Sequence, residues 1–292
     1  MALNTNPRPT FNDRRSAVNL GRFNPTEWDD IVGNANLKEF WTNLLQRVRK
    51  GNCRSESFLV TGGSREGKTS TISFGIKAML CCNFNFATMN PCHQCVNCRS
   101  NFYLNGTGEW NGQVDFADPA ENPTPVRFEF FPVDCSRLKE SDVDDLCMKL
   151  RVDDGNLKIV YLDEVHRLVR RNIDEMLLRP MDDYEAIWIA SSAVIRKDGI
   201  DDTGKIDKMT QKRFNRQLVT QRPDKREISL WLARLCNQFS IEVDDPKTLL
   251  HLADRSNRVP GMALKVLNTA HNDPDRKLTF EMVEDHIFDL DE

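Results

Sequence analysis

The sequence predicts a three-layer α/β domain with a mainly parallel five-stranded sheet, followed by a small all-α domain. Short apolar runs alternate with segments of helical periodicity up to about residue 222, an order typical of a parallel sheet covered by helices. One apolar run leads into a glycine-rich loop and then a helix, and after residue 222 every periodic segment is helical. We therefore expect an α/β domain over 23–222 and a helical domain over 223–292. The polar residues 1–22 are expected to form a flexible tail.

The bulk composition restricts the function classes. A net charge of −4 at pH 7 argues against a broad basic surface for nucleic acid, although a local basic track is compatible with it. The chain has neither an apolar run of about 20 residues nor a signal-peptide pattern after Met1. We therefore expect a cytoplasmic protein without membrane association. Nine cysteines are many for a compartment where disulfides are rare, so clustered ones suggest a metal.

The first third of the chain contains two predicted helices on either side of a predicted strand. Apolar residues at helical spacing predict a helix over 35–49. A buried strand at 58–62 precedes the glycine-rich loop, and a helix over 68–80 follows it. From residue 81 to residue 127 no period is sustained, so we interpret this segment, rich in cysteine, asparagine, glycine and proline, as an insertion.

The other strands are predicted further along the chain. They span 126–134, 157–162, 186–190 and 216–221. Ser141 is expected to be the N-cap of a helix that runs through Leu150, with acidic residues in its first turn. In the second domain, prolines separate predicted helices at 224–239, 246–256, 260–271 and 279–288.

The glycine-rich loop has the complete Gly-x-x-x-x-Gly-Lys-Thr spacing of a phosphate-binding loop. Lys68 is expected to reach the β- and γ-phosphates of a nucleotide, and the Thr69 hydroxyl to bind Mg²⁺. Main-chain N–H groups of the loop and the positive end of the following helix would face the phosphates. The candidate nucleotide-binding residues are Gly62, Gly63, Ser64, Arg65, Glu66, Gly67, Lys68, Thr69 and Ser70, with Ile31 and Val32 as candidates for an adenine site. The alternative is a glycine turn that binds nothing.

Two acids follow the strand at 157–162, at the end where α/β proteins bind their ligands. Asp163 would hold Mg²⁺ through water, and Glu164 would act as general base for an attacking water. The alternative is a strand end with two solvated acids. Ser191 and Ser192 end the next strand, where a polar side chain could orient the water or contact the γ-phosphate, although small serines are common at such places.

A cysteine group lies within the insertion. Cys92, Cys95 and Cys98 stand at two-residue gaps, and one distal thiolate could complete a tetrahedral Zn²⁺ site with them. Cys82 is the predicted fourth ligand, and Cys81 and His93 are the alternatives. With four thiolates no position stays open, so the predicted role is structural.

An iron–sulfur cluster is the competing interpretation of the same group. Its usual run would place a further cysteine near position 102, followed by proline. Phe102 and Tyr103 stand there instead, which favours zinc.

These motifs together resemble those of the AAA+ ATPases of clamp loaders, most closely the gamma/tau subunits of bacterial DNA polymerase III. The resemblance covers residues 24–271. Its points of match are Trp28-Asp29-Asp30-Ile31-Val32-Gly33, the glycine-rich loop, the cysteine group after its helix, the segment 136–150, and Asp163-Glu164-Val165-His166. It implies ATP, Mg²⁺ and Zn²⁺ as cofactors. It also implies a ring of loader subunits that places a sliding clamp on primer-template DNA, with a DNA polymerase as a possible further partner.

The resemblance also assigns residues that act between subunits. Arg213 matches the arginine finger, the residue that stabilises charge on the γ-phosphate in a neighbouring subunit, and Lys212 and Arg216 are its rivals. Ser192 matches the position that contacts the γ-phosphate within the subunit, termed sensor 1.

Two departures from the family pattern bear on activity. The second sensor position, an arginine in the family, falls near Gly261, where Arg258 could substitute. No sequence follows Glu292 for the family's ring-closing collar, so we expect assembly through another subunit's collar or work outside a standard loader. The alternatives to a hydrolysing loader subunit are therefore a slow or inactive adaptor subunit, or another remodeller of DNA or protein such as a helicase loader.

Overall fold

The fold was analysed in a computed structural model. It describes residues 25–95, 98, 114–116, 126–169, 173–193, 195–197, 200–202 and 208–286. The predicted tail, 1–22, and much of the predicted insertion lie outside the described residues. Among the described residues no helix is long and apolar enough to cross a membrane.

The centre of the fold is a sheet with the strand order β2-β3-β4-β5-β1-β8. Its strands are β1 (Glu56–Gly62), β2 (Val114–Phe116), β3 (Val126–Asp134), β4 (Leu157–Asp163), β5 (Ile187–Ala193) and β8 (Arg216–Val219). Every neighbouring pair is parallel except β2 and β3. The predicted parallel sheet is therefore confirmed. The antiparallel edge strand β2 was not predicted, because three residues within an aperiodic segment carry no pattern.

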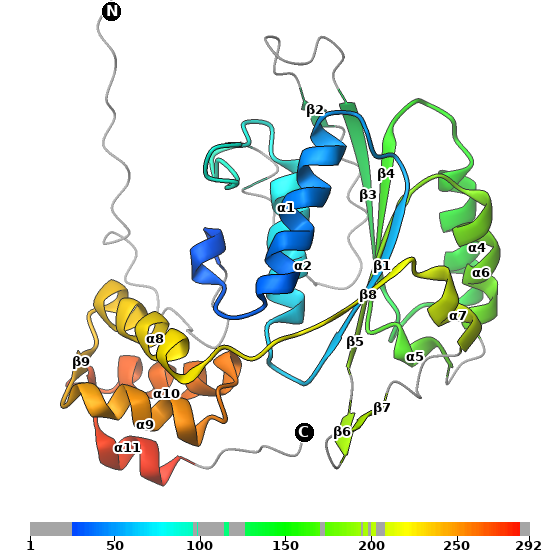
Figure 1. The fold of residues 1–292 in the computed structure, drawn as a ribbon. Coiled ribbons are helices and arrows are strands. Elements are labelled where there is room, and N and C mark those ends of the chain that lie inside the picture. Colours follow the sequence, from blue (N-terminus) through cyan, green and yellow to red (C-terminus); the bar gives the residue numbers. More distant parts are fainter. Residues whose placement is uncertain are drawn as a thin grey trace, which may run out of the picture.

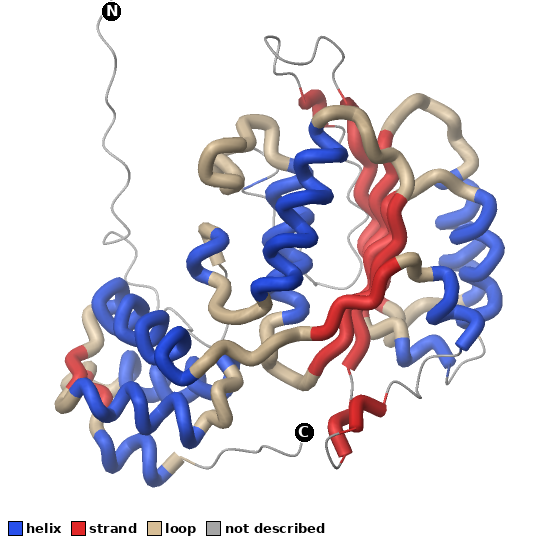
Figure 2. The backbone as a smooth tube through the Cα atoms, in the orientation of Figure 1, coloured by secondary structure: helices blue, strands red, loops and turns tan. Residues whose placement is uncertain are grey.

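Side chains alternate between the two faces of the sheet and create two cores. Phe58 and Val60 of β1 pack with α1 (Ala35–Arg49) and α2 (Lys68–Leu80) on one face. On the other face, Leu59 packs with α4 (Glu140–Leu150) and α6 (Asp174–Asp183). Figures 1 and 2 show the resulting three layers, with α1 and α2 on one side of the sheet and α4 and α6 on the other.

The bounds of α1 and α2 agree with the prediction, but α4 begins earlier than expected. Its N-cap is Lys139 rather than Ser141, and the Asp142 carboxylate accepts a hydrogen bond of 2.8 Å from the Lys139 N–H. Asp142 thus binds the N–H of the N-cap residue, and Ser141 lies inside the first turn of the helix. The short helices α5 (His166–Val169), α6 and α7 (Lys208–Arg213) were not predicted; Pro180 within α6 reads as a helix breaker.

Other short elements were also missed by sequence reasoning. They are the 3₁₀ helix η3 (Trp28–Asp30) and the antiparallel pair β6 (Ile195–Lys197) and β7 (Ile200–Asp202).

The C-terminal segment packs around its own core. Its described elements are α8 (Lys225–Phe239), β9 (Glu242–Val243), α9 (Pro246–Arg255), α10 (Pro260–Asn272), β10 (Lys277–Leu278) and α11 (Phe280–Asp285). The four predicted helices are present, but β9 and β10 form a short parallel pair, so this unit is not purely helical. Figure 1 shows it beside the end of the sheet where α2 begins. Val32, far away in sequence, belongs to its core, so the chain before α1 joins the unit to the rest of the fold.

Candidate functional site

The glycine-rich loop connects the carboxyl end of β1 to the first turn of α2. Gly67 has a φ of 90° and forms the N-cap, so Lys68 and Thr69 are the first residues of the helix. Lys68 Nζ donates hydrogen bonds to the carbonyl oxygens of Gly62, at 2.8 Å, and Gly63, at 2.7 Å. The ammonium group thus lies within the curve of the loop, where the sequence predicted it would meet phosphates.

Close packing explains why the loop must begin with glycine. A Cβ atom on Gly62 would lie 1.8 Å from Thr220 Oγ1, which no real Cβ tolerates. Thr220 follows β8, and its N–H donates to the Thr61 carbonyl oxygen at 2.8 Å. The loop is therefore built directly against the segment that leaves the sheet for α8.

The two predicted acids lie at the same edge of the sheet as the loop. β5 lies between β4 and β1, and Leu162 pairs with Ala190 while Val60 pairs with Ser191. Asp163 therefore lies at the level of Ser191, two strand spacings, or roughly 10 Å, from β1. This edge is where ligands bind in parallel α/β sheets.

Hydrogen bonds fix Asp163 in place. Its Oδ1 accepts from Ser191 Oγ at 2.6 Å and from the Tyr161 hydroxyl at 2.8 Å. Burial, and then the nearby Asp163 charge, raise the pKa of Tyr161 well above its ordinary value, so the phenol stays a donor. One carboxylate oxygen is thereby committed to the protein.

Glu164 adopts an unusual backbone conformation, with a φ of 54°. Such strain at a non-glycine residue persists only where the surroundings hold it. Here the Glu164 N–H donates to Ser191 Oγ at 3.0 Å, and the carboxylate is about half exposed and pairs with Arg167 Nε at 3.3 Å. The side chain of Glu164 thus has access to solvent, as a base that activates water requires.

The structure distinguishes the two serines at the end of β5. Ser191 contacts Asp163 and the Glu164 amide, whereas Ser192 Oγ lies 3.3 Å from His166 Nδ1 and is buried. Successive residues of a strand face opposite sides, so only one serine can face the acids. The hydroxyl that contacts the acids is therefore that of Ser191, whereas Ser192, which we expect at the γ-phosphate, lies beside His166.

The candidate arginine finger lies near the amino ends of the strands, at the opposite end of the sheet from the glycine-rich loop. The Arg213 carbonyl accepts from Ser57 Oγ at 2.7 Å, and Ser57 is near the start of β1. Ser57 and Gly62 are five positions apart along the strand, roughly 17 Å. The Arg213 guanidinium pairs with Asp182 of α6, with Nη2 2.9 Å from Oδ2. Arg213 therefore points away from the loop of its own chain; Lys212 and Arg216 flank it in sequence.

The N-terminus of α10 packs onto the loop where the family has its second sensor. The Gly261 N–H donates to the Arg65 carbonyl at 3.1 Å, and a Cβ on Gly261 would lie 2.6 Å from Arg65 Cβ. Glycine is thus required by the packing, and a larger residue would push α10 away. Arg258, the suggested substitute, lies two residues before α10 with a φ of 59°.

The residues suggested for the adenine site lie between the two cores. Ile31 is buried in the core of the α/β domain, and Val32 in the core of the C-terminal unit. The next two residues bind the C-terminal unit and the glycine-rich loop. The Gly33 N–H donates to Glu227 Oε1 of α8 at 2.9 Å, and Asn34 Nδ2 donates to the Glu66 carbonyl oxygen of the loop at 3.0 Å. This segment therefore connects the glycine-rich loop to α8.

Sequence reasoning missed the role of one side chain inside the loop. The Glu66 side chain is 1% exposed, and its carboxylate accepts hydrogen bonds from the Gly63 N–H, the Thr220 hydroxyl and Arg222 Nε. The sequence predicts only a main-chain role for Glu66, as one of the residues whose N–H groups face phosphates. An acid in a loop that is expected to face phosphates needs a cation nearby. This requirement could have indicated from the sequence that Glu66 has a cationic partner.

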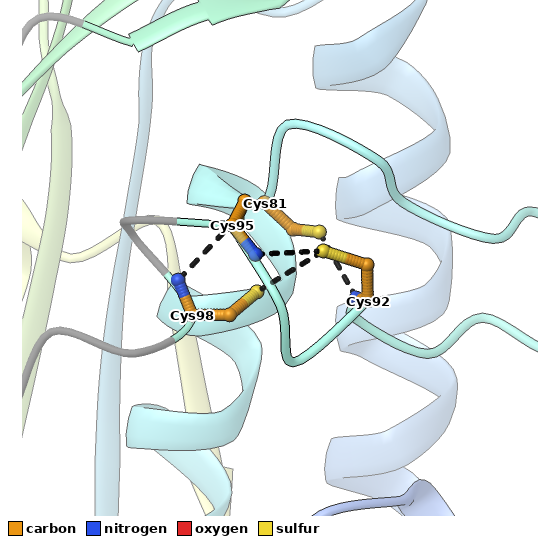
Figure 3. A group of neighbouring side chains, drawn as sticks. All are labelled: Cys81, Cys92, Cys95 and Cys98. Atoms are coloured by element: carbon orange, nitrogen blue, oxygen red, sulfur yellow. Dashed lines mark hydrogen bonds between the residues drawn. The ribbon is translucent and has the colours of Figure 1, made fainter. Parts of the chain in front are cut away.

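The cysteine group has the dimensions of a zinc site. The Sγ atoms of Cys81, Cys92, Cys95 and Cys98 all lie within 4.8 Å of one another, and those of Cys92 and Cys98 are 3.9 Å apart (Figure 3). Four thiolates about 2.3 Å from a tetrahedral zinc ion lie about 3.8 Å from one another. Main-chain N–H groups point at the sulfur atoms, for example that of Cys92 at 3.1 Å from Cys81 Sγ. The donor set and its spacing therefore fit zinc.

The fourth cysteine of this group is Cys81, and not Cys82, which the sequence predicts as the fourth zinc ligand. Cys81 ends α2 as its C-cap and is fully buried, and its thiol lies in the group. Cys82 is half-buried and packs against the core of the α/β domain. Hydrogen bonding with Cys98 lowers the pKa of Cys81 to about 5, whereas burial raises that of Cys82 to about 11. The direction in which the chain leaves α2 determines which of the two adjacent cysteines points into the group.

Two cations lie near the cysteine group. Arg49 Nη2 donates to the carbonyl oxygens of Cys81, at 2.6 Å, and Ala78, at 2.9 Å. Burial lowers the pKa of Arg49 to about 10, against the opposing influence of the thiols of Cys81 and its neighbours. Burial also lowers the pKa of Lys77, which Cys98 opposes. A zinc ion with four thiolates carries two net negative charges, which two adjacent cations would offset.

We expect the purified chain to contain about one zinc ion. Cys81→Ser should remove the metal, because it deletes a ligand of a closed four-sulfur site, and should lower the melting temperature. Cys82→Ser is the matched control and should keep a full complement of zinc. Elemental analysis measures both. Equal zinc content in the two variants would contradict the ligand assignment, and a well-folded wild-type chain without metal would contradict the zinc site.

Comparison with known proteins identifies the fold. The sequence matches no family model and no curated protein. Among solved structures, the chain is similar to the RuvB Holliday junction branch migration motor of Thermotoga maritima, with a TM-score of 0.56 and 15% identity over 91% of this chain and 71% of that one. Two variants of the same RuvB give TM-scores of 0.58, at 14% identity over 89% and 70%, and 0.57, at 15% identity over 91% and 71%. Identity this low carries the fold alone, so this chain shares the fold of RuvB.

Proposed function

We propose that the chain binds MgATP and hydrolyses it to ADP and phosphate. The observation that carries this proposal is the shared edge of the sheet: the glycine-rich loop with Lys68 inside its curve and the acids Asp163 and Glu164 flank the end of β5. Hydrogen bonds from Ser191 to Asp163 and from the Glu164 amide to Ser191 preorganise the acids before any ligand binds. If the glycine-rich loop were a turn that binds nothing, we would not expect two acids held in fixed positions at the same end of the sheet.

Each residue then has one task. Lys68 would neutralise charge on the β- and γ-phosphates, and Thr69 and Asp163 would hold Mg²⁺, Asp163 through water. Glu164 accepts a proton from the attacking water. Ser191 would orient Asp163 through its hydroxyl and Glu164 through its backbone N–H, and Ser192 stays the candidate for contact with the γ-phosphate.

We further propose that the chain is a subunit of a DNA clamp loader. Support comes from the resemblance in sequence and from a zinc-type cysteine group placed directly after α2. In such an assembly, the neighbouring loader subunits, a sliding clamp and primer-template DNA are the partners, and a DNA polymerase is a further one. The position of Arg213, at the edge opposite its own loop, suits action on the nucleotide of a neighbour.

The proposal is tested by phosphate release from the chain together with the subunits and clamp that co-purify from its native source. Primed DNA and clamp together should stimulate turnover, whereas double-stranded DNA without primer ends should not. If the chain binds ATP tightly and no combination stimulates turnover, the motor function is wrong.

A second candidate is a nucleotide-binding adaptor that hydrolyses slowly or not at all. The observation that favours it is the packing at Gly261, where the family's arginine would displace α10 from the loop. Tight ATP binding without stimulated turnover would support the adaptor. The fold of a branch migration motor keeps a third candidate open, a remodeller of DNA other than a clamp loader, which failure to bind a clamp would favour.

Replacing Arg213 should show whether it acts between chains. In the assembly that turns over ATP, we expect Arg213→Ala to lower turnover about 1,000-fold with unchanged ATP affinity, because the arginine would stabilise only the charge of the transition state. Mixing this variant with a Lys68→Ala chain should restore part of the activity, since each supplies what the other lacks. Lys212→Ala and Arg216→Ala are the matched controls, and an equal loss in either would reassign the finger.

A further inference from the structure

The buried carboxylate of Glu66 connects the glycine-rich loop to the segment that carries the C-terminal helices. Its Oε2 accepts from the Gly63 N–H at 2.9 Å and from the Thr220 hydroxyl, and its Oε1 accepts from Arg222 Nε at 2.7 Å. Gly63 belongs to the loop, whereas Thr220 and Arg222 belong to the linker 220–224 between β8 and α8. A single side chain therefore joins two segments more than 150 residues apart in sequence.

Burying the Glu66 carboxylate costs free energy, which indicates that this side chain does more than fill space. A buried carboxylate is strongly disfavoured unless cations and hydrogen-bond donors surround it. Arg222 supplies the charge and is itself one-quarter exposed, so it can move more easily than the acid. In a loop that binds a triphosphate, the Glu66 carboxylate would repel the negatively charged phosphates. Arg222 is the cation that compensates this charge.

Hydrogen bonds to Asn34 hold the linker in position beside the glycine-rich loop. The Gln221 N–H donates to Asn34 Oδ1 at 2.8 Å, the Asn34 N–H donates to the Gln221 carbonyl at 3.1 Å, and Asn34 Nδ2 in turn donates to the Glu66 carbonyl. Two residues after Arg222, Asp224 caps α8. A shift of the loop is therefore passed to the first turn of α8 through both the side chain and the main chain of Glu66.

We propose that Glu66 and Arg222 are positioning residues that couple occupancy of the glycine-rich loop to the orientation of α8–α11. The inference rests on the proposed ATPase function. Nucleotide charge entering the loop changes the balance between Glu66 and Arg222, and the linker responds by resetting the C-terminal helices. Those helices contact the loop a second time through Gly261 and Arg65, so their orientation feeds back on the nucleotide site.

Two charge-neutralising variants, Glu66→Gln and Arg222→Gln, test the coupling. Amide hydrogen exchange of the full chain is measured with and without MgATP, together with kcat and KM for ATP. In the wild type, ATP should slow exchange in peptides of the loop, 62–70, and of the linker and α8, 220–230. In either variant the loop should remain protected, while the slowing over 220–230 falls at least threefold and kcat falls about tenfold with a smaller change in KM.

The double variant and a matched control sharpen the result. Glu66→Gln with Arg222→Gln should be no worse than the more affected single variant, because residues that act as one unit are not additive. Glu242→Gln makes the same chemical change in an exposed pair of the C-terminal unit, with Lys277 3.2 Å away, and should behave as wild type.

The outcomes separate this inference from the proposed function. If the wild type hydrolyses ATP and the variants retain ATP-dependent protection over 220–230, or if their effects on kcat add, the coupling is wrong and the ATPase proposal stands. If the wild type binds no ATP, both fail. Should either single variant not fold, the double variant decides alone, since it leaves no uncompensated buried charge: wild-type slowing over 220–230 in that variant would contradict the coupling.

Discussion

Replacement of Lys68 by alanine is expected to weaken MgATP binding by about 100-fold or more. The ammonium group lies inside the loop, 2.8 Å and 2.7 Å from the carbonyl oxygens of Gly62 and Gly63. A hydrogen bond to a charged partner contributes about 1.5–3 kcal/mol, and Lys68 would serve two phosphates. Isothermal titration calorimetry with MgATP measures the loss directly.

The same substitution should have only a modest effect on the folded chain. Lys68 is only partly buried, so water can replace its ammonium group at the two carbonyl oxygens, and the variant should remain folded at room temperature. Lys247→Ala, which removes an exposed lysine of α9, is the control for charge and should bind ATP as the wild type does. Unchanged ATP affinity in Lys68→Ala would remove the assignment of the whole nucleotide site.

Replacement of Glu164 by glutamine should stop the chemistry while ATP remains bound. A general base contributes about 100- to 10,000-fold to a rate, so kcat should fall within that range. The amide keeps the size of the carboxylate and can keep the strained backbone, because the Glu164 N–H bond to Ser191 does not involve the side chain. Affinity for ATP should therefore be unchanged, and radiolabelled ATP should be recovered unhydrolysed from the protein.

Two comparisons make this result specific. Glu242→Gln repeats the chemical change at a distant exposed glutamate and should leave turnover intact. Arg167→Ala removes the partner of the Glu164 carboxylate, an exposed pair of the kind that contributes about 0–1 kcal/mol, and should alter the rate by less than tenfold. Wild-type turnover in Glu164→Gln would exclude this residue as the base.

The ATPase proposal and the coupling through Glu66 have different physical bases. In the proposed function, Lys68, Asp163 and Glu164 would act on groups that the nucleotide brings, whereas Glu66 and Arg222 contact each other and the linker. Variants of the first group should therefore lose binding or chemistry, and those of the second should lose communication with α8. The two sets of measurements distinguish a chain that fails as an enzyme from one that fails to transmit its nucleotide state.

Much of the fold was determined by local pattern in the sequence. Helices α1 and α2 have the predicted bounds, and the five parallel strands lie close to their predicted positions, because burial imposes its period of 3.6 or 2 residues on the chain itself. The spacing of Gly62, Gly67, Lys68 and Thr69 likewise encodes a loop that closes over few residues. Such features need no information from elsewhere in the chain.

Only the tertiary structure decided which of two neighbouring residues performs a task. Cys81 rather than Cys82 joins the cysteine group, and Ser191 rather than Ser192 contacts Asp163, because a shift of one residue changes the direction of a side chain but hardly alters composition. The partnership of Glu66 with Arg222 depends on two segments meeting in space, 156 positions apart, and no local pattern records such a meeting. The sequence alone thus predicted the kinds of site, and long-range packing decided which side chains come together in them.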